Sequence, residues 1–214
     1  MKIKWLGHAS FLITSDDGTK IITDPFGDYP GLKYRPVNQL ADIVVISHSH
    51  GDHVGGSISG NPKTISKKGE NKAGAFTFRG IETYHDTKKG KERGGNTIFC
   101  FSVDGISICH LGDLGHDLSD AEIKVLGQVD VLMVPVGGFY TIDAVTAEGI
   151  CEQLRPKIVL PMHYKNEKCD FPIAPVDDFL KNKQNVKREN ASEVEFNRGQ
   201  LPASTTIFVL KPAL

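Results

Sequence analysis

The strongest constraint on this chain is a histidine-rich hexapeptide, His48–His53, with the sequence HSHGDH. It follows the run Ile43–Ile46, whose four β-branched apolar residues are typical of a buried strand. Three imidazoles and a carboxylate within six residues are more than packing or a solvated turn requires. Imidazole nitrogen is the commonest side-chain ligand for metals. The hexapeptide therefore predicts a metal site at a strand end, with alternate histidines directed at one ion and Asp52 and His53 at a second.

The length and composition are those of an ordinary folded domain. The 214 residues include 39% apolar and 24% charged residues, close to globular averages. We expect residues 1–214 to form one domain with a substantial core. The formal net charge of −1 provides no general attraction to nucleic acid or acidic lipid. We therefore expect a small-molecule substrate rather than a membrane or a long nucleic acid.

Neither the N-terminus nor the cysteines point to export. The segment Met1–Trp5 lacks the apolar core of a signal peptide, and no apolar run has the length of a membrane span. A cytoplasmic location is the simplest expectation. The four cysteines show no C-x-x-C spacing, so we expect buried reduced thiols rather than a metal-binding or redox pair.

The first part of the chain predicts an antiparallel meander. Residues 2–6, 10–15 and 19–23 have strand patterns, with a turn at 16–18. His8 lies between the first two strands. Two interpretations are equally favoured: a polar side chain whose hydrogen bonds are satisfied at a strand end, or a residue of the functional site. Glycines and prolines then predict a surface loop from Asp24 to Leu40. In this loop Tyr29, Tyr34 and Arg35 are candidates for one wall of a substrate cleft, and ordinary packing of the aromatic rings is the alternative.

The second part alternates strands with helices. Strands are predicted at residues 42–47, 63–66, 74–79, 80–85, 96–103, 106–111, 130–135, 157–161 and 205–210. The dipeptide Asp104-Gly105 predicts a type I′ hairpin, and Ser119–Glu122 forms a capping box that opens a helix. A second helix, capped by Asp143, ends before Pro156, and a third covers residues 175–182. The strand–helix–strand order around the second helix predicts a parallel crossover.

These residues together resemble the metallo-β-lactamase superfamily, and within it the branch of the ascorbate-6-phosphate lactonases. The similar segments, besides the hexapeptide, are Leu6–Ala9, Thr23–Phe26, His85, His110–Asp113 and Pro161–Tyr164. The resemblance implies an α+β fold, a four-layer αβ/βα sandwich, whereas composition and periodicity indicate only a mixed α and β domain. The segment 54–60 departs from the pattern, because relatives place a helix there and this chain has mainly glycine and serine. Any helix after the hexapeptide should be short or absent.

The resemblance also implies the ligands. His48, His50 and His85 would bind one divalent metal ion, and Asp52, His53 and His163 a second, with Asp113 between the two. Zinc is the first expectation, with manganese and iron as alternatives, because imidazole and carboxylate ligands accept all three. The segment Gly7-His8-Ala9 is similar to one in related sequences, so the resemblance also implies a place for His8 near the metals, as a supporting residue or a substrate contact. Of the histidines that flank Asp113, we expect His110 to support the site and His116 to lie at the surface.

The expected function is a metal-dependent hydrolase. Paired metals lower the pKa of a water molecule and polarise an electrophilic oxygen, so a metal-bridged hydroxide would attack a small, anionic ester or lactone. Asp52 would orient the nucleophile, and His8 or a metal would stabilise the oxyanion. The basic run Lys88–Arg93 and Lys165 favour an anionic substrate, unless the run is a solvated hairpin tip. Further candidate substrate contacts are Arg93, Asn96 and Tyr164.

Three other functions remain open on the sequence. A phosphodiesterase or nuclease would use the same fold, but the weakly acidic pI of about 6.7 does not favour long nucleic acids. A di-iron redox protein related to the flavodi-iron proteins would be expected to carry a fused flavodoxin-like domain, for which this chain has no room. A non-catalytic metal-binding protein would typically lack a ligand, and none is missing here.

Overall fold

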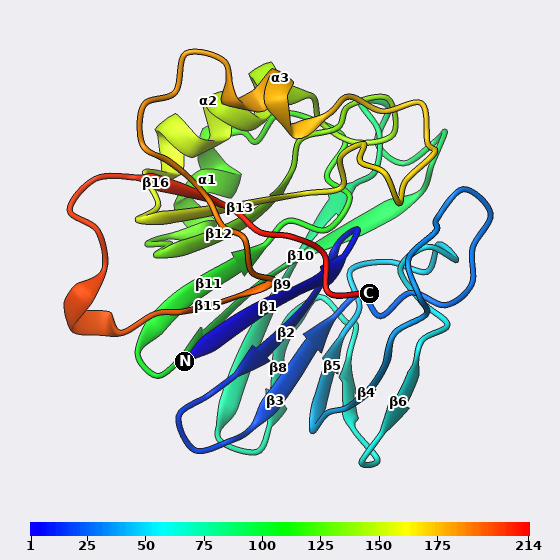
Figure 1. The fold of residues 1–214 in the computed structure, drawn as a ribbon, viewed down its shortest axis with the longest axis vertical. Helices are drawn as coiled ribbons and strands as arrows, with labels where there is room; N and C mark the ends of the chain where they lie inside the picture. Colours follow the sequence, from blue (N-terminus) through cyan, green and yellow to red (C-terminus); the bar gives the residue numbers. More distant parts are fainter.

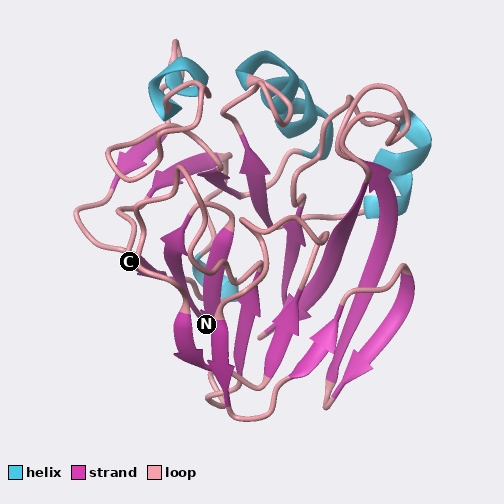
Figure 2. Ribbon diagram, turned by 90° about the vertical axis from the view of Figure 1, so that its right-hand side faces the viewer, coloured by secondary structure: helices cyan, strands magenta, loops and turns pink.

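Two β-sheets form the body of the protein. The computed structural model describes residues 1–214, and its strands dominate over a few short helices (Figure 2). A six-stranded sheet has the order β15-β1-β2-β3-β5-β7, and an eight-stranded sheet has the order β14-β16-β13-β12-β11-β10-β9-β8 (Figure 1). A separate two-stranded sheet pairs β4 with β6. The expected α+β sandwich is confirmed.

The elements have the following bounds. The six-stranded sheet contains β1 Lys2–Gly7, β2 Ser10–Thr14, β3 Lys20–Thr23, β5 Ile43–Val45, β7 Lys63–Ile65 and β15 Glu193–Glu195. The eight-stranded sheet contains β8 Gly69–Ala73, β9 Phe76–Tyr84, β10 Gly95–Val103, β11 Ile106–His110, β12 Val131–Pro135, β13 Ile158–Met162, β14 Val186–Arg188 and β16 Thr206–Val209. The small sheet contains β4 Asn38–Leu40 and β6 Ser57–Ser59. The helices are α1 Asp120–Leu126, α2 Ala144–Leu154, α3 Val176–Leu180 and the short 3₁₀ helix η1 Arg198–Gln200.

Strand direction decides where the polar residues gather. In the six-stranded sheet, β2 is antiparallel to both β1 and β3, and β5 is parallel to β3, so β1, β3 and β5 point the same way. In the eight-stranded sheet, β9, β11, β12 and β13 share one direction by the same reasoning. Strands with a common direction end at the same edge of a sheet. The residues that follow these strands therefore collect at one edge of each sheet.

Alternation of side chains along the strands gives the first sheet two apolar faces. Ile3, Phe11 and Ile21 belong to the main core, a cluster of 45 buried residues that also includes apolar residues of the eight-stranded sheet and of all three α-helices. Leu12 and Ile22 point the other way, into a second cluster of ten buried residues. Both faces of this sheet are therefore covered.

The cover on the outer face of the first sheet contains no helix. All three α-helices lie beside the eight-stranded sheet (Figure 1). The second cluster instead takes Phe26, Tyr34, Val37 and Ala41 from the loop before β5. After the hexapeptide the chain forms no helix, as expected, and instead forms the short strand β6. None of the helices is long and apolar enough to cross a lipid bilayer.

The predicted helix caps and the predicted hairpin turn are confirmed. The side chain of Ser119 accepts the Glu122 backbone N–H, and the Glu122 carboxylate accepts the Ser119 backbone N–H, which completes the capping box. Asp104 and Gly105 have φ angles of 51° and 73°, as a type I′ turn requires. Asp143 caps α2 by accepting the backbone N–H of Thr146 at 2.9 Å.

Predictions that depended on a single glycine were less successful. Segments 74–79 and 80–85 are one strand, β9, and the chain does not break at Gly80. A Cβ at Gly80 would lie 2.4 Å from the carbonyl oxygen of Lys67, so the glycine is required by close packing rather than by a turn.

The thiols of Cys100 and Cys109, on neighbouring strands, lie 3.7 Å apart, a pairing that the spacing did not predict. All four cysteines are free thiols.

Loss of the α2 cap should destabilise the fold. We expect Asp143→Ala to lower the free energy of unfolding by about 1 kcal/mol, because one N–H at the start of the helix loses its acceptor. Urea denaturation measures the change. Asp28→Ala, at an exposed loop position, is the matched control and should be neutral. Equal stabilities of the two variants would show that the cap does not contribute.

Candidate metal centre

All seven predicted metal ligands meet where the two sheets share an edge. Four of them, three histidines and Asp52, come from the hexapeptide turn after β5. His85 directly follows β9, and His163 directly follows β13. Asp113 lies three residues beyond the end of β11. The common direction of these strands explains why ligands from four separate parts of the chain come together.

The carboxylate of Asp113 lies at the middle of the group. Its Oδ2 atom is 3.0 Å from Nε2 of His85, 3.3 Å from Nε2 of His163 and 3.9 Å from Nε2 of His48. Its Oδ1 atom is 3.1 Å from Nε2 of His53. Only 1% of Asp113 is exposed. One buried carboxylate therefore touches histidines of both predicted metal sites, in the position that the resemblance implied.

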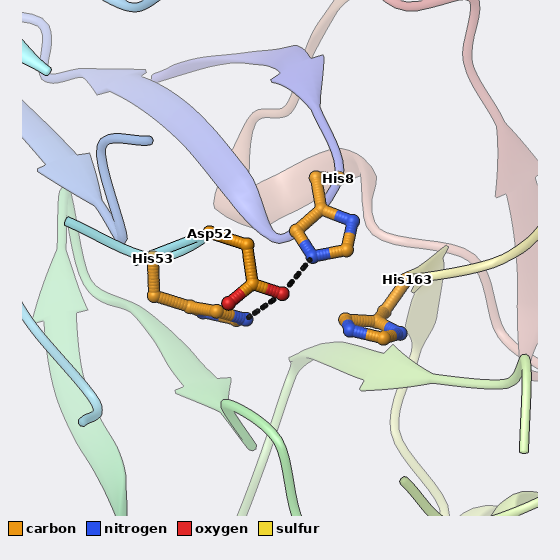
Figure 3. Close-up of side chains that lie close together, drawn as sticks. All are labelled: His8, Asp52, His53 and His163. Carbon is orange, nitrogen blue, oxygen red and sulfur yellow. Dashed lines mark hydrogen bonds and ion pairs between the residues drawn. The ribbon is translucent and has the colours of Figure 1, made fainter. Parts of the chain in front are cut away.

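The side chains divide into two groups that could each hold an ion. The candidate ligand atoms of His48, His50 and His85 lie within 4.8 Å of one another. A second group with the same spacing contains His8 together with Asp52, His53 and His163 (Figure 3). A third group, His48, His53 and Asp113, overlaps both of these. The first two groups match the predicted division, except that His8 joins the second. Of the two interpretations of His8, the structure favours the one that places it in the site.

Unsatisfied buried atoms show that these residues fit metal ions. Nε2 of His48, His53 and His163 and Oδ1 of Asp113 are buried and form no hydrogen bond of good geometry, although Nε2 of His53 and Oδ1 of Asp113 are 3.1 Å apart. A buried polar atom left in this way costs about 1–3 kcal/mol, so several in one place require an explanation. Nitrogen and carboxylate donors of this kind suit zinc, manganese or iron. Bound divalent ions would satisfy all four atoms.

The charges are coupled across the site. Burial opposes the charge on Asp113, but His163 and His53 hold the pKa of its carboxyl well below the usual range. Burial alone would lower the pKa of His53, yet Asp113 and Asp24 raise it well above its ordinary value. Burial and the nearby His163 lower the pKa of His8 to about 4, so this ring is neutral at pH 7. A cation that binds between His53 and Asp113 would displace the proton of His53, and metal binding should therefore weaken as the pH falls.

Asp24 is a supporting residue whose role the sequence did not predict. Its carboxylate accepts the backbone N–H and the hydroxyl of Ser47, at 2.7 and 2.8 Å. The same carboxylate lies 3.1 Å from Nδ1 of His53 and 2.7 Å from Nε2 of His110. It therefore fixes the far side of the His53 ring, so that Nε2 faces Asp113. His110 supports the site as expected, and it does so through Asp24.

Three of the nine non-glycine residues with positive φ angles lie at this edge. His8, Asp24 and His163 have left-handed φ angles of 49°, 38° and 50°. Each such residue costs about 1–3 kcal/mol, so it persists only where the surrounding contacts hold it. The backbone N–H of His163 donates to the carbonyl of His8 at 3.2 Å, and the indole N–H of Trp5 donates to the same carbonyl at 3.0 Å. The bond from His163 joins the loops of the two sheets, and the bond from Trp5 holds the His8 carbonyl within the first sheet.

Asn96 has a different role from the substrate contact that we expected. It is buried, and its amide N–H groups donate to the Thr83 hydroxyl and to the Leu111 carbonyl, both at 2.9 Å. Its side-chain oxygen accepts the backbone N–H of Asp113 at 3.0 Å. With its donors and acceptor all engaged, Asn96 positions the loop that carries Asp113 rather than meeting a substrate.

Two tyrosines proposed for the cleft belong to the core instead. Tyr164 is buried, and its ring packs on Trp5 with the centroids 5.2 Å apart. Tyr34 is also buried, and its hydroxyl accepts from the side chain of Asn166. Arg35 is exposed and donates to the carbonyl of Ala213. Of the three candidates in the first long loop, only Tyr29 remains beside the site.

A cleft of about 590 Å³ opens onto the ligands. The site residues that line it are His50, Asp52, His85 and Asp113. The other lining side chains of interest are Tyr29, Glu92, Arg93, Tyr140 and Phe171. A cleft of similar size, about 610 Å³, lies beside α2 and β16 and contains no histidine. The first cleft is therefore the candidate substrate site.

The loop after His85 is shaped by Asp86. The carboxylate of Asp86 accepts the backbone N–H groups of Lys88, Gly90, Glu92 and Arg93. Burial opposes its charge, but these N–H groups, that of Arg93 foremost, lower its pKa to about 2. The loop therefore has a defined backbone up to Arg93.

The basic run in this loop does not line the cleft as expected. Lys88, Lys89 and Lys91 are exposed, and Lys88 pairs with Glu92 at 2.6 Å. Arg93 is the one cationic residue of the run that lines the cleft. Lys165 is exposed as well, and its ammonium donates to the Phe171 carbonyl. The lysines therefore match the alternative interpretation, a solvated hairpin tip, and one cationic side chain of the run remains at the cleft.

Comparison with known proteins agrees with this geometry. Residues 2–163 match the model of the beta-lactamase superfamily domain. The chain is 34% identical over 205 residues to a UPF0173 metal-dependent hydrolase of Carboxydothermus hydrogenoformans, covering 83% of this chain and 88% of the relative. It is also similar to a structure from Thermotoga maritima, described as a candidate zinc-dependent hydrolase of the metallo-β-lactamase superfamily. That similarity has a TM-score of 0.80 and 37% identity, and covers 98% of this chain and 97% of the other.

The chain therefore belongs to the beta-lactamase superfamily. A relative from Archaeoglobus fulgidus, also a UPF0173 metal-dependent hydrolase, is 29% identical over 214 residues and covers 85% of this chain and 90% of the relative. At this similarity and coverage we assign the chain to the same class of enzyme, the metal-dependent hydrolases.

Asp24 should control metal affinity without touching a metal. We expect Asp24→Asn to weaken zinc binding by about 10–100-fold, because the amide supports the His53 ring less strongly than a carboxylate does. Competition with a chromogenic chelator measures the affinity. Asp117→Asn, at an exposed position, is the matched control. A folded Asp24→Asn protein with unchanged zinc affinity would contradict the supporting role.

Proposed function

We propose that this protein hydrolyses a small ester or lactone at two divalent ions, which the seven ligands hold with Asp113 shared between them. The observation that carries the proposal is the position of Asp113, whose carboxylate contacts histidines of both groups at the floor of an open cleft. Zinc is the first candidate, with manganese and iron as alternatives, because the donors are imidazoles and carboxylates.

When bound, two such ions supply a water molecule of lowered pKa and a Lewis acid for the acyl oxygen. Asp52 lines the cleft, and a carboxylate at this position can accept the proton of an attacking water. Burial opposes its charge, but the hydrogen bond from His8 keeps the pKa of Asp52 below its ordinary value. Asp52 is therefore ionised at neutral pH and ready to act as a base.

His8 acts through Asp52 in this proposal. Nε2 of His8 lies 3.2 Å from Oδ2 of Asp52 (Figure 3), and the neutral ring can donate one proton to that oxygen. His8 is buried and does not line the cleft. It would therefore fix the direction of the Asp52 carboxylate rather than contact the oxyanion, the other role considered for it.

The cleft supports a small acyl substrate more strongly than a nucleic acid. Its volume of about 590 Å³ lies within the range of small-molecule sites. Long nucleic acids are bound by many cations, whereas Arg93 is the one cationic side chain that lines this cleft. The same arginine supports a substrate with an anionic group. A phosphodiesterase of small substrates is the second candidate, and no observation specifically favours a redox or a non-catalytic role.

Asp113 should be essential and Lys89 dispensable. We expect Asp113→Ala to lower kcat/KM by more than about 100-fold, because both groups of ligands lose their shared carboxylate. Lys89→Ala should be unchanged, because this lysine is exposed and does not line the cleft. Zinc- and manganese-loaded protein would be assayed on lactones and carboxylic esters. Equal losses in the two variants, with metal content retained, would contradict the shared role of Asp113.

Removal of metal should abolish the activity and its return should restore it. After treatment with a chelator we expect hydrolysis to fall to background, and added zinc or manganese to restore it, because eight histidine and aspartate side chains at the site are candidate ligands. A parallel assay with bis(p-nitrophenyl) phosphate separates the two candidate functions. Faster metal-dependent turnover of this phosphodiester than of every ester and lactone would favour the second candidate.

A further inference from the structure

Aromatic rings form one continuous wall of the cleft. Phe171 lies at its centre, with ring-centroid distances of 5.6 Å to His8, 5.7 Å to Tyr140 and 6.2 Å to Tyr29. All three contacts are edge-to-face, with interplanar angles of 74–85°. Tyr29, Tyr140 and Phe171, which line the cleft, come from three separate loops, so the wall is not a by-product of one element. It runs from the second metal group to the mouth of the cleft.

The glycine of the hexapeptide is required by this wall. A Cβ at Gly51 would lie 2.8 Å from Cε2 of Tyr29, which is closer than real Cβ contacts. The φ angle of Gly51 is not in the left-handed region, so glycine is required for space rather than for conformation. The ring of Tyr29 therefore lies directly against the metal-binding turn.

Arg93 provides a single positive charge opposite the floor. Its guanidinium lies 5.7 Å from the centroid of the Tyr140 ring. It is half-buried and forms no ion pair, whereas the neighbouring Glu92 is paired with Lys88. Asp86 holds its backbone N–H at 2.8 Å. A positioned, unpaired guanidinium is suited to one carboxylate or similar planar anion, which it can bind by two parallel hydrogen bonds.

The wall continues outward to Phe139. This ring is 63% exposed and packs edge-to-face on Tyr140 at 4.7 Å. Its backbone has a φ angle of 61°, which is strained for an aromatic residue. An exposed aromatic ring held in a strained conformation beside a cleft extends the apolar surface available to a ligand.

The lining also shows which substrates the cleft does not suit. Apart from the site residues, Arg93 and the paired Glu92, its polar groups are the hydroxyls of Tyr29 and Tyr140. No serine, threonine, asparagine or glutamine lines it. Recognition of a polyhydroxylated sugar lactone would require several such hydrogen-bonding groups, because each buried hydroxyl needs a partner.

We propose that the substrate carries a flat, unsaturated ring beside the scissile carbonyl and one anionic group, and that Tyr140, Phe171 and Arg93 are the residues that select it. The ring would pack on the wall formed by Tyr29, Tyr140 and Phe171, and the anion would bind the guanidinium of Arg93. This inference rests on the proposed ester or lactone hydrolysis, because it describes the substrate of that same cleft. It favours an aryl carboxylate ester over a sugar-derived lactone.

Binding of hydrolysis-resistant amides tests the selection without requiring turnover. The probes are 4-carbamoylbenzoate, its saturated analogue 4-carbamoylcyclohexanecarboxylate, and the neutral terephthalamide, each titrated calorimetrically into zinc-loaded protein. We expect 4-carbamoylbenzoate to bind about tenfold more tightly than the saturated analogue, because only the flat ring packs on the aromatic wall. It should also bind at least about tenfold more tightly than the neutral diamide, because only it carries the charge for Arg93.

Matched variants assign each preference to its residues. Arg93→Gln should remove the preference for the anion alone, and Tyr140→Leu or Phe171→Leu the preference for the flat ring. Tyr140→Phe keeps the ring and should retain that preference, and Lys89→Gln, in the same loop, should change neither. Near-ultraviolet circular dichroism confirms that each variant is folded.

Two results would overturn this selection. One is equal binding of the three probes, or no binding of any. In the other, the preference for the anion persists in Arg93→Gln and the preference for the flat ring persists in Phe171→Leu. That result would mean that the carboxylate binds the metal ions instead. The outcome is separate from the proposed function. Selective binding with no hydrolysis of the corresponding methyl ester would overturn ester hydrolysis and leave the selection intact.

Discussion

The buried carboxylate of Asp113 is the feature on which the rest of the structure depends. An ionised carboxylate away from water is strongly unfavourable unless charges and hydrogen bonds compensate it. Here the compensation comes from imidazoles on both sheets, at 3.0 Å from His85, 3.1 Å from His53 and 3.3 Å from His163. Because no single strand could deliver these rings, the two sheets must end at the same edge. The sandwich places the carboxyl ends of β5, β9, β11 and β13 there.

Around this carboxylate, polar residues hold the loops rather than meet the substrate. Asp24 fixes the ring of His53, Asn96 holds the backbone of Asp113, and Asp86 shapes the loop that ends in Arg93. Each of them follows or begins a strand at the ligand edge. The floor of the cleft is therefore rigid, whereas its mouth is formed by aromatic side chains from loops. This division suits a site that must hold metals firmly and still admit a ligand.

The sequence was sufficient to predict local structures that depend on a few neighbouring residues. The capping box at Ser119, the type I′ turn at Asp104 and the absence of a helix after His53 all depend on a few neighbouring residues. The ligands were predicted because their residue types and order match a superfamily, and the structure brings them together. Strands β14 and β15, three residues each, depend on their partners and carry no signal of their own.

Side-chain direction was the part that the sequence could not supply. Arg93 and Asn96 are three residues apart in the same segment, and both were candidate substrate contacts. The first reaches the cleft, while the second turns inward to Thr83 and Leu111. Likewise, the lysines beside Arg93 point to solvent although they share its charge. Which way a residue faces depends on the loop backbone, and here that backbone is set by Asp86, a residue with no distinctive sequence signal.

The most direct test of the account is the number and position of bound metals. Crystals soaked in millimolar zinc or manganese would be measured with anomalous scattering at the absorption edge of the metal. We expect two peaks per chain, one beside His48, His50 and His85 and one beside Asp52, His53 and His163, with Asp113 between them. A single occupied position at saturating metal, with His85 or His163 turned away from Asp113, would contradict the account.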